Sequence, residues 1–199
     1  MHLLRSLVVP ASLAALLLAG CHVSTHKDGK NENVDIGTPF GSMQVKTNGK
    51  GDTTAIGIAA YPGATLVSNN GKDSDEGSAD INMNFGSFHL GVKAASYQTG
   101  DPQSRVEAFY RKELAHYGDV IECRHGSAVG QPTRTSQGLT CDTKHGNHIS
   151  TDDSDSDLDL RTGSEQHQHI VGLTAKDGGT RIGLVALDLP TGHEHKDSE

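Results

Sequence analysis

Residues 101–118 read DPQSRVEAFYRKELAHYG, and this stretch decides the fold. Asp101 can accept the free amides of a helix start, Pro102 suits the first helical position, and Gly118 can adopt the left-handed conformation that ends a helix. Apolar side chains recur at helical spacing on one stripe, at Val106, Phe109, Tyr110, Leu114 and Tyr117. We predict an amphipathic helix from Pro102 to Tyr117 whose stripe packs on a sheet.

Segments on both sides of this helix have the patterns of β-strands. Residues 79–92 alternate apolar and polar side chains around Gly86-Ser87, which indicates two strands that turn or kink there. Further strands are expected at 54–60, 65–68, 119–124, 138–143, 158–161, 170–175 and 181–189. Strands before and after a single helix predict an α+β fold, a single small domain in which an antiparallel sheet packs on one main helix.

The first 20 residues have the features of a secretory signal peptide. Arg5 precedes an apolar stretch that runs from Ser6 to Leu18, and small residues follow before Cys21. The sequence Leu18-Ala19-Gly20-Cys21 resembles the lipobox of bacterial lipoproteins, in which the signal is cleaved before the cysteine and the cysteine is acylated. The resemblance implies that Cys21 is the lipidated first residue of the mature protein. The alternative is an ordinary signal peptide followed by a chance cysteine.

Four parts are expected along the chain. Residues 1–20 form the lipoprotein signal peptide, and residues 21–35 form the lipidated cysteine and a flexible tether. The tether sequence HVSTHKDGKNENVD has almost no large apolar side chain, which is typical of a segment that does not fold alone. An α+β domain occupies residues 36–190, and residues 191–199 form a polar tail.

Composition and charge limit the partners. The chain has no Trp and only four Phe and four Tyr, so its core is small. The formal net charge of −8 leaves no basic face for a phosphate backbone and excludes nucleic acid as a partner. Acyl chains on Cys21 would hold the protein at a membrane. His22 is not the aspartate that retains lipoproteins in the inner membrane of some bacteria, which favours the outer membrane, facing the periplasm.

Two segments resemble a pattern in uncharacterised bacterial envelope proteins. Tyr61-Pro62-Gly63-Ala64 matches a YPGA-type turn, and residues 106–114, VEAFYRKEL, match a helix that reads close to V-x-x-FY-x-x-EL. The resemblance covers residues 56–190 and implies a fold. It implies no activity and assigns no functional residue.

The cysteine count predicts a disulfide. The chain has three cysteines, and acylation of Cys21 would leave Cys123 and Cys141 as an even pair in an oxidising compartment. Each lies in a short expected strand, and the polar loop between them can bring these strands together. A pair of buried free thiols is the alternative.

Histidines are the candidate metal ligands. Twelve occur in the chain, and the sets His145 with His148 and His167 with His169 are closely spaced, as are His193 and His195. Imidazole binds Zn²⁺, Cu²⁺ and Ni²⁺, and two histidines two residues apart on a strand share a face. No HExxH or CxxC framework organises these sets, so we expect no specific metal site and no cofactor.

Motifs for catalysis are absent from the sequence. Neither G-x-S-x-G nor a P-loop occurs, and the one S-x-x-K match, at residues 24–27, lies in the expected tether. These observations predict a lipid-anchored envelope protein that is a binding or structural module and no enzyme, with an envelope protein or a small ligand as its partner. A metal-handling, histidine-rich lipoprotein and an envelope enzyme with an unrecognised site are the alternatives.

Lipidation gives the first testable prediction. We expect protein purified from its own membranes to begin at Cys21 and to carry the mass of its acyl chains, because the lipobox directs cleavage and acylation at that residue. The Cys21→Ser variant should remain unprocessed or leave the membrane. Intact mass spectrometry checks both results, and an unmodified Cys21 in membrane-derived protein would contradict the lipobox interpretation.

Overall fold

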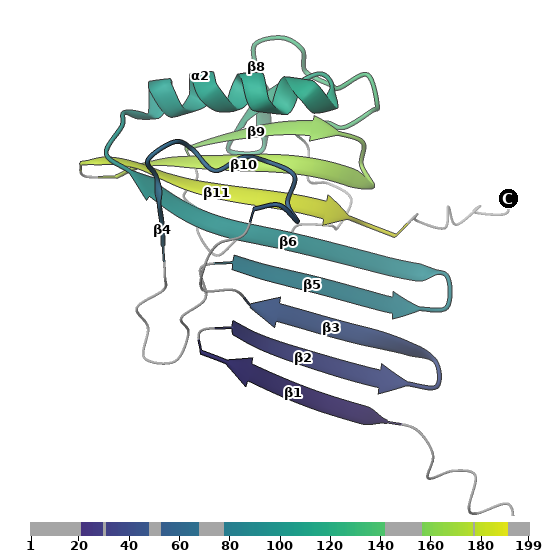
Figure 1. The fold of residues 1–199 in the computed structure, drawn as a ribbon. Helices are drawn as coiled ribbons and strands as arrows, with labels where there is room; N and C mark the ends of the chain where they lie inside the picture. Colours follow the sequence, from purple (N-terminus) through teal and green to yellow (C-terminus); the bar gives the residue numbers. More distant parts are fainter. Residues whose placement is uncertain are drawn as a thin grey trace, which may run out of the picture.

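A computed structural model of the protein describes residues 21–29, 31–47, 53–67, 78–141, 157–176 and 178–190. In these ranges, eleven strands join in one antiparallel sheet in the order β1-β2-β3-β5-β6-β11-β10-β9-β7-β8, and β4 pairs with β6 from outside this order (Figure 1). The strands are β1 His22–Asp28, β2 Asn31–Thr38, β3 Gly41–Thr47, β4 Thr65–Leu66, β5 Ser78–Phe85, β6 Phe88–Thr99, β7 Ile121–Arg124, β8 Ser127–Val129, β9 Leu158–Gly163, β10 His167–Lys176 and β11 Gly179–Asp188.

The helix expected from the apolar stripe is present. Helix α2 spans Gln103–Leu114, and one 3₁₀ turn continues it to Tyr117. Its N-cap is Pro102, not Asp101, and no side chain bonds to the free amides there. Asp101 instead accepts a hydrogen bond from the Tyr61 hydroxyl at 2.6 Å. This contact ties the start of the helix to the preceding loop.

The main core lies between the helix and the sheet. Helix α2 packs on β9, β10 and β11. The helix contributes Val106, Tyr110 and Leu114, and the sheet contributes Leu158, Leu160, Val171, Leu173, Ile182 and Leu184, all completely buried. Residues 53–66 also belong to this side, because Ile56, Ile58 and Tyr61 join the same buried cluster. The expected turn is present there, with Ala64 N donating to Tyr61 O at 3.0 Å and Gly63 at φ +76°.

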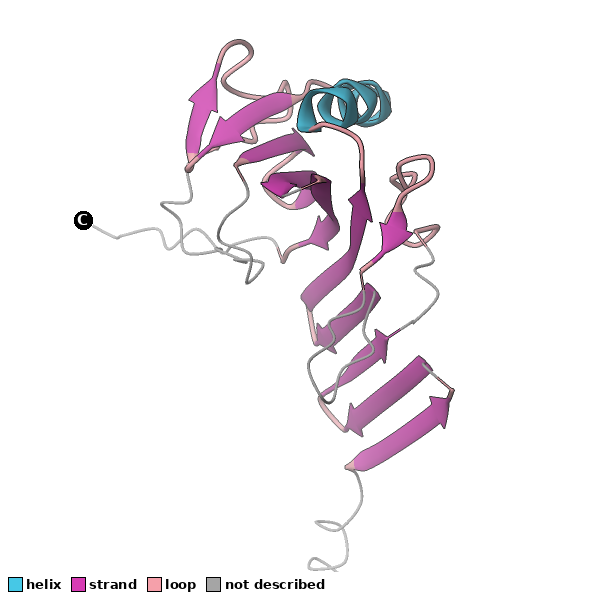
Figure 2. Cartoon of the chain, turned by 90° about the vertical axis from the view of Figure 1, so that its left-hand side faces the viewer, coloured by secondary structure: helices cyan, strands magenta, loops and turns pink. Residues whose placement is uncertain are grey.

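The α+β prediction is wrong, because the described chain is nearly all β with a single short helix. The expected antiparallel sheet is present but is much larger than the helix that covers part of it (Figure 2). Residues 22–38 account for much of the difference. The composition predicts a flexible tether up to residue 35, whereas the structure forms β1 and β2 there, paired from His22 with Gly37 to Asp28 with Asn31. Polar side chains are compatible with these strands because β1 is exposed along its whole length.

Other strands differ in detail from the expectation. Residues 79–92 form the hairpin of β5 and β6, and β10 with β11 forms the final hairpin. Of the strand expected at 138–143, the described residues 138–141 form only two isolated bridges, Arg134 with Thr140 and Gly138 with Ser164. The short strand β8 lies in a segment expected to be loop.

Candidate functional site

Five neighbouring strands extend away from the helix. We call β1, β2, β3, β5 and residues 88–94 of β6 the wing. Figures 1 and 2 show α2 over the β9 to β11 end of the sheet, with the wing reaching away from it. The wing is therefore a sheet with two faces outside the helix-covered core.

Strand register sorts the side chains of the wing onto two faces, because directly paired residues share a face and successive residues alternate. One row across the wing pairs Val34, Val45, Ile81 and Val92. The next row pairs Ile36, Met43, Met83 and Leu90. We call these eight side chains the apolar face. All are half-buried, and none belongs to a buried core cluster.

The opposite face of the wing is polar. One row pairs Asn33, Lys46, Asp80 and Lys93, so that charges of opposite sign are adjacent. In the next row, Gln44 donates to the Asp35 carboxylate, and Asn82 lies beside Gln44 in the register. The amide of Asn82 also donates to Asp80 Oδ1 at 2.6 Å. The charged and amide side chains of this face suit contact with water.

The polar face lies on the same side of the sheet as the helix. Lys93 and Tyr97 are four residues apart in β6 and so share a face, and Tyr97 pairs with Ile182 beneath the helix. The apolar face is consequently on the side away from α2. Apolar side chains thus change sides of the sheet along β6: Val92 faces away from the helix, whereas Ala95 and Tyr97 face the helix-side core.

The apolar face was not singled out from the sequence, although a signal exists. Val34 and Ile36 alternate with polar residues, and Met43 and Val45 repeat this spacing after a turn. Alternation over so few residues is a weak pattern, and the polar composition of 22–35 hides it. The strand register reveals the face, because it places the apolar residues of these short segments side by side on one side of the sheet.

Two of the histidines considered as weak metal ligands, His167 and His169, each contact a different side chain. His167 Nδ1 lies 2.8 Å from Asp188 Oδ1, and the ring of His169 stacks on Tyr117 with centroids 4.0 Å apart. Within the described ranges, no group of three or more His, Cys, Asp or Glu side chains could hold a metal ion. His145 and His148, like His193 and His195, lie outside the described residues.

His169 sits in a small packed cluster. The Tyr117 hydroxyl donates to the carbonyl of Gly57. Gly57 has φ +80°, and a Cβ there would lie 2.9 Å from the Tyr117 hydroxyl, so the position requires glycine. Burial lowers the pKa of His169, and the nearby Asp188 partly offsets this effect. The cluster therefore favours the neutral imidazole.

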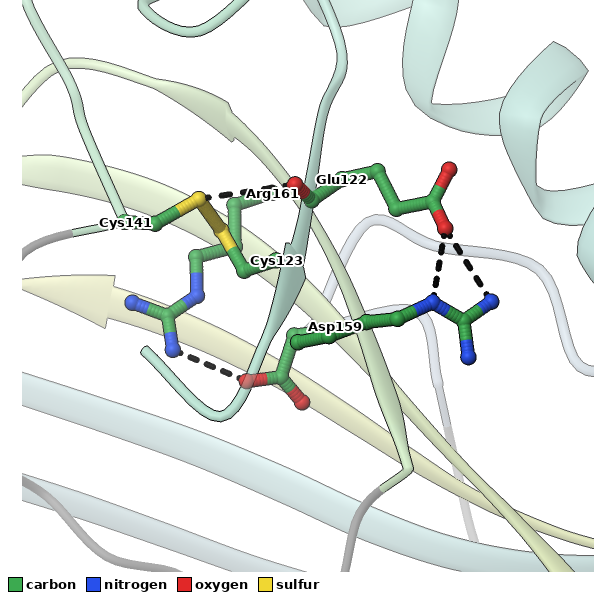
Figure 3. The surroundings of a disulfide bond; sticks show 6 residues. Glu122, Cys123, Cys141, Asp159 and Arg161 are labelled. Carbon is green, nitrogen blue, oxygen red and sulfur yellow. Dashed lines mark hydrogen bonds and ion pairs between the residues drawn. A yellow bond between two sulfur atoms is a disulfide. The ribbon is translucent and has the colours of Figure 1, made fainter. Parts of the chain in front are cut away.

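Cys123 and Cys141 form a disulfide, with Cα atoms 5.6 Å apart. Both cysteines are buried and pack with Ile121 and Leu139 in a second small cluster. Cys123 pairs in register with Asp159, whose carboxylate accepts a 2.8 Å hydrogen bond from Arg161 (Figure 3). The neighbouring Glu122 pairs with Arg111 of the helix. The disulfide thus fastens the loop after β8 to β7, next to two ion pairs.

Cys21 is exposed and directly precedes β1. The carboxylate of Asp157 accepts a hydrogen bond from the Ala175 amide at 3.0 Å, and Asp159 pairs with Arg161. Over the part of the chain that the structure describes, no helix has the length and apolar character to cross a membrane. Comparisons of the chain with protein-family models, with curated proteins and with solved structures find no match.

Loss of the disulfide should weaken the fold measurably. The bridge closes a loop between residues 18 apart in sequence, so the Cys123→Ala/Cys141→Ala variant should lose about 3 kcal/mol of unfolding free energy. Denaturant titration of oxidised and reduced wild type provides the comparison, since reduction should reproduce the loss in wild type and leave the variant unchanged. Two reactive thiols in denatured, unreduced wild type would contradict the bridge.

The His169 cluster should make stability sensitive to pH. Because the pKa of His169 is lower in the folded protein than its ordinary 6.5, the unfolded chain binds this proton more readily, and stability falls as pH drops through about 6.5. His169→Gln should show a smaller decrease in Tm between about pH 7.5 and pH 5.5 than wild type. The control is His116→Gln on the exposed 3₁₀ turn, and equal slopes for all three proteins would refute the assignment.

Proposed function

We propose that the chain is a lipid-anchored bacterial envelope protein that works as a binding module, with the apolar face as its binding surface. The observation that carries this proposal is the alignment of eight apolar side chains in two rows across four strands, on the side of the sheet away from the helix. These side chains are half-buried and belong to no buried core cluster, so a partner that covers them would remove further apolar surface from water. The lipobox supports the anchor.

The size and shape of the apolar face suit a protein partner. The four strands that carry it lie about 4.8 Å apart, so each row is roughly 14 Å long, and the two rows lie two residues, about 7 Å, apart. Small-molecule sites are concave and enclose their ligand, whereas sheets pack face to face about 10 Å apart.

The partner that we propose is a second copy of the chain. A second copy carries the same apolar rows, and a twofold axis makes one surface complementary to itself. If that axis runs along the strands, the apolar faces meet and both β1 strands begin at the same end of the dimer. Both Cys21 residues can then be anchored in one membrane, so the proposed dimer and the proposed anchor are compatible.

The two alternative functions have less in their support. The described histidines that could bind metal are engaged elsewhere, His167 with Asp188 and His169 with Tyr117. The charged groups drawn in Figure 3 form ion pairs with one another: Glu122 of β7 pairs with Arg111 of α2, and Asp159 pairs with Arg161 within β9, which is a structural arrangement. The apolar face, which carries the proposed binding function, takes no part in these histidine contacts and ion pairs.

The oligomeric state of two variants tests this function. We expect the full, lipidated wild type to be a dimer by light scattering in mild detergent. Val45→Lys, which places a charge at the centre of the apolar face, should shift the protein to monomer. Gln44→Lys is the matched control, because residue 44 lies on the polar face beside Asp35 and tolerates a positive charge.

Circular dichroism should show the same strand content for both variants. Monomeric wild type at every concentration tested would refute the second copy as partner. A monomer that co-purifies with a stoichiometric lipid on this face would identify an amphiphile as the occupant and would equally contradict the proposal.

A further inference from the structure

Two turns at one end of the wing carry three of the four phenylalanines of the chain, and all three side chains are exposed. They are the β2–β3 turn, residues 38–41, and the β5–β6 turn, residues 85–88. Phe40 is 84% exposed, Phe85 39% and Phe88 41%. The fourth phenylalanine, Phe109, packs against the main core. Contact of three large aromatic side chains with water is unfavourable, so their exposure at one end of a sheet indicates an interaction site.

The three phenylalanines lie in two neighbouring turns at the same end of the sheet. Gly41 pairs with Phe85, and Phe85 pairs with Phe88 across the next turn. A Cβ on Gly41 would lie only 2.3 Å from Cδ1 of Phe85, which shows that the Phe85 ring lies over the glycine backbone. Phe40 is the residue before Gly41. We call Phe40, Phe85 and Phe88 the aromatic tip.

The aromatic tip is at the end of the sheet where β1 begins. His22 pairs with Gly37, which is followed by the β2–β3 turn that carries Phe40. Figure 1 shows the start of β1, the β2–β3 turn and the β5–β6 turn together at the right-hand end of the wing. Cys21, which directly precedes β1, therefore lies at the same end as the aromatic tip.

The two turns suit the interface of a bilayer. Their sequences, TPFG and FGSF, contain no ionisable side chain, so no charge has to leave water when they enter the headgroup region. Aromatic side chains are favoured at this depth, and small polar residues remain within reach of headgroups and water. A turn tip is also narrow, so it can enter the interface while the strands remain outside.

We propose that the aromatic tip is a membrane-docking site that inserts into the interfacial region of the bilayer beside the lipid on Cys21. The inference rests on the proposed function only in that the lipid brings this end of the sheet to the membrane. Docking at both places would hold the strands upright on the bilayer. Phe85 and Phe88 lie on the same side of the sheet as the apolar face, which would then begin at the membrane surface.

Tryptophan provides the probe, because the wild-type chain contains none. Phe40→Trp and Phe88→Trp place a fluorophore in each turn. Val129→Trp is the matched control, since Val129 is an apolar residue as exposed as Phe88, at 41%, and lies in β8 at the far side of the sheet. Full, lipidated protein is reconstituted in vesicles of mixed zwitterionic and anionic phospholipids, with or without bromine on the acyl chains.

Brominated lipid should quench the emission of Phe40→Trp and Phe88→Trp by about half or more and should leave Val129→Trp unchanged, because bromine quenches at short range and Trp favours the interface. Vesicle-bound protein in which all three positions are equally unquenched would overturn docking while leaving the anchor intact. A blue-shifted emission at positions 40 and 88 that depends on protein concentration and not on vesicles would assign the tip to a protein contact and also overturn the proposal.

The anchor is checked separately by the mass of Cys21 in the same samples. An unacylated Cys21 would contradict the proposed function, whereas docking would still be decided by quenching of the unlipidated protein added to vesicles. Quenching there at positions 40 and 88 would support docking without the anchor. Its absence at both positions would overturn docking as well.

Discussion

The pairing of β6 with β11 is the interaction on which the whole sheet depends. It extends from Gly91 with Asp188 to Thr99 with Thr180, and it joins the wing to the strands beneath the helix. β6 can join the two parts because its apolar side chains change faces along its length. Val92 faces away from the helix within the wing, and Tyr97 faces the core beneath the helix. Without this ladder, the wing would have no link to a buried core.

The two parts of the sheet are stabilised in different ways. Beneath α2, completely buried side chains such as Leu173 and Leu184 provide the hydrophobic free energy of the fold. The wing has no comparable core and relies on main-chain ladders and half-buried rows, so a partner on the apolar face would add stability where the chain itself supplies least. Edge strand β1 is fully exposed and carries Lys27, a charge that discourages uncontrolled pairing with other strands.

Sequence patterns predict the parts of this structure that have strong local signals. The stripe from Val106 to Leu114 specifies α2, and the segments expected as strands at 170–175 and 181–189 correspond to β10 and β11. The wing could not be predicted because its apolar residues are separated by polar ones and by turns, and only register brings Val34, Val45 and Ile81 together. The number of cysteines predicted the disulfide between Cys123 and Cys141, which the structure contains. The sequence did not predict that Cys141 lies outside a regular strand, where isolated bridges and the disulfide hold the chain in place.

The central claim is that the wing is a folded part of the sheet and that its apolar face follows from this. Hydrogen–deuterium exchange of the full, lipidated protein in vesicles tests it most directly. We predict that amides in β2, β3 and β5 exchange as slowly as those in β6 and β11, because every one of these strands is paired on both sides. Exchange of residues 31–47 at the rate of an unstructured chain, with β10 and β11 still protected, would contradict this claim and would support the tether that the composition predicts up to residue 35.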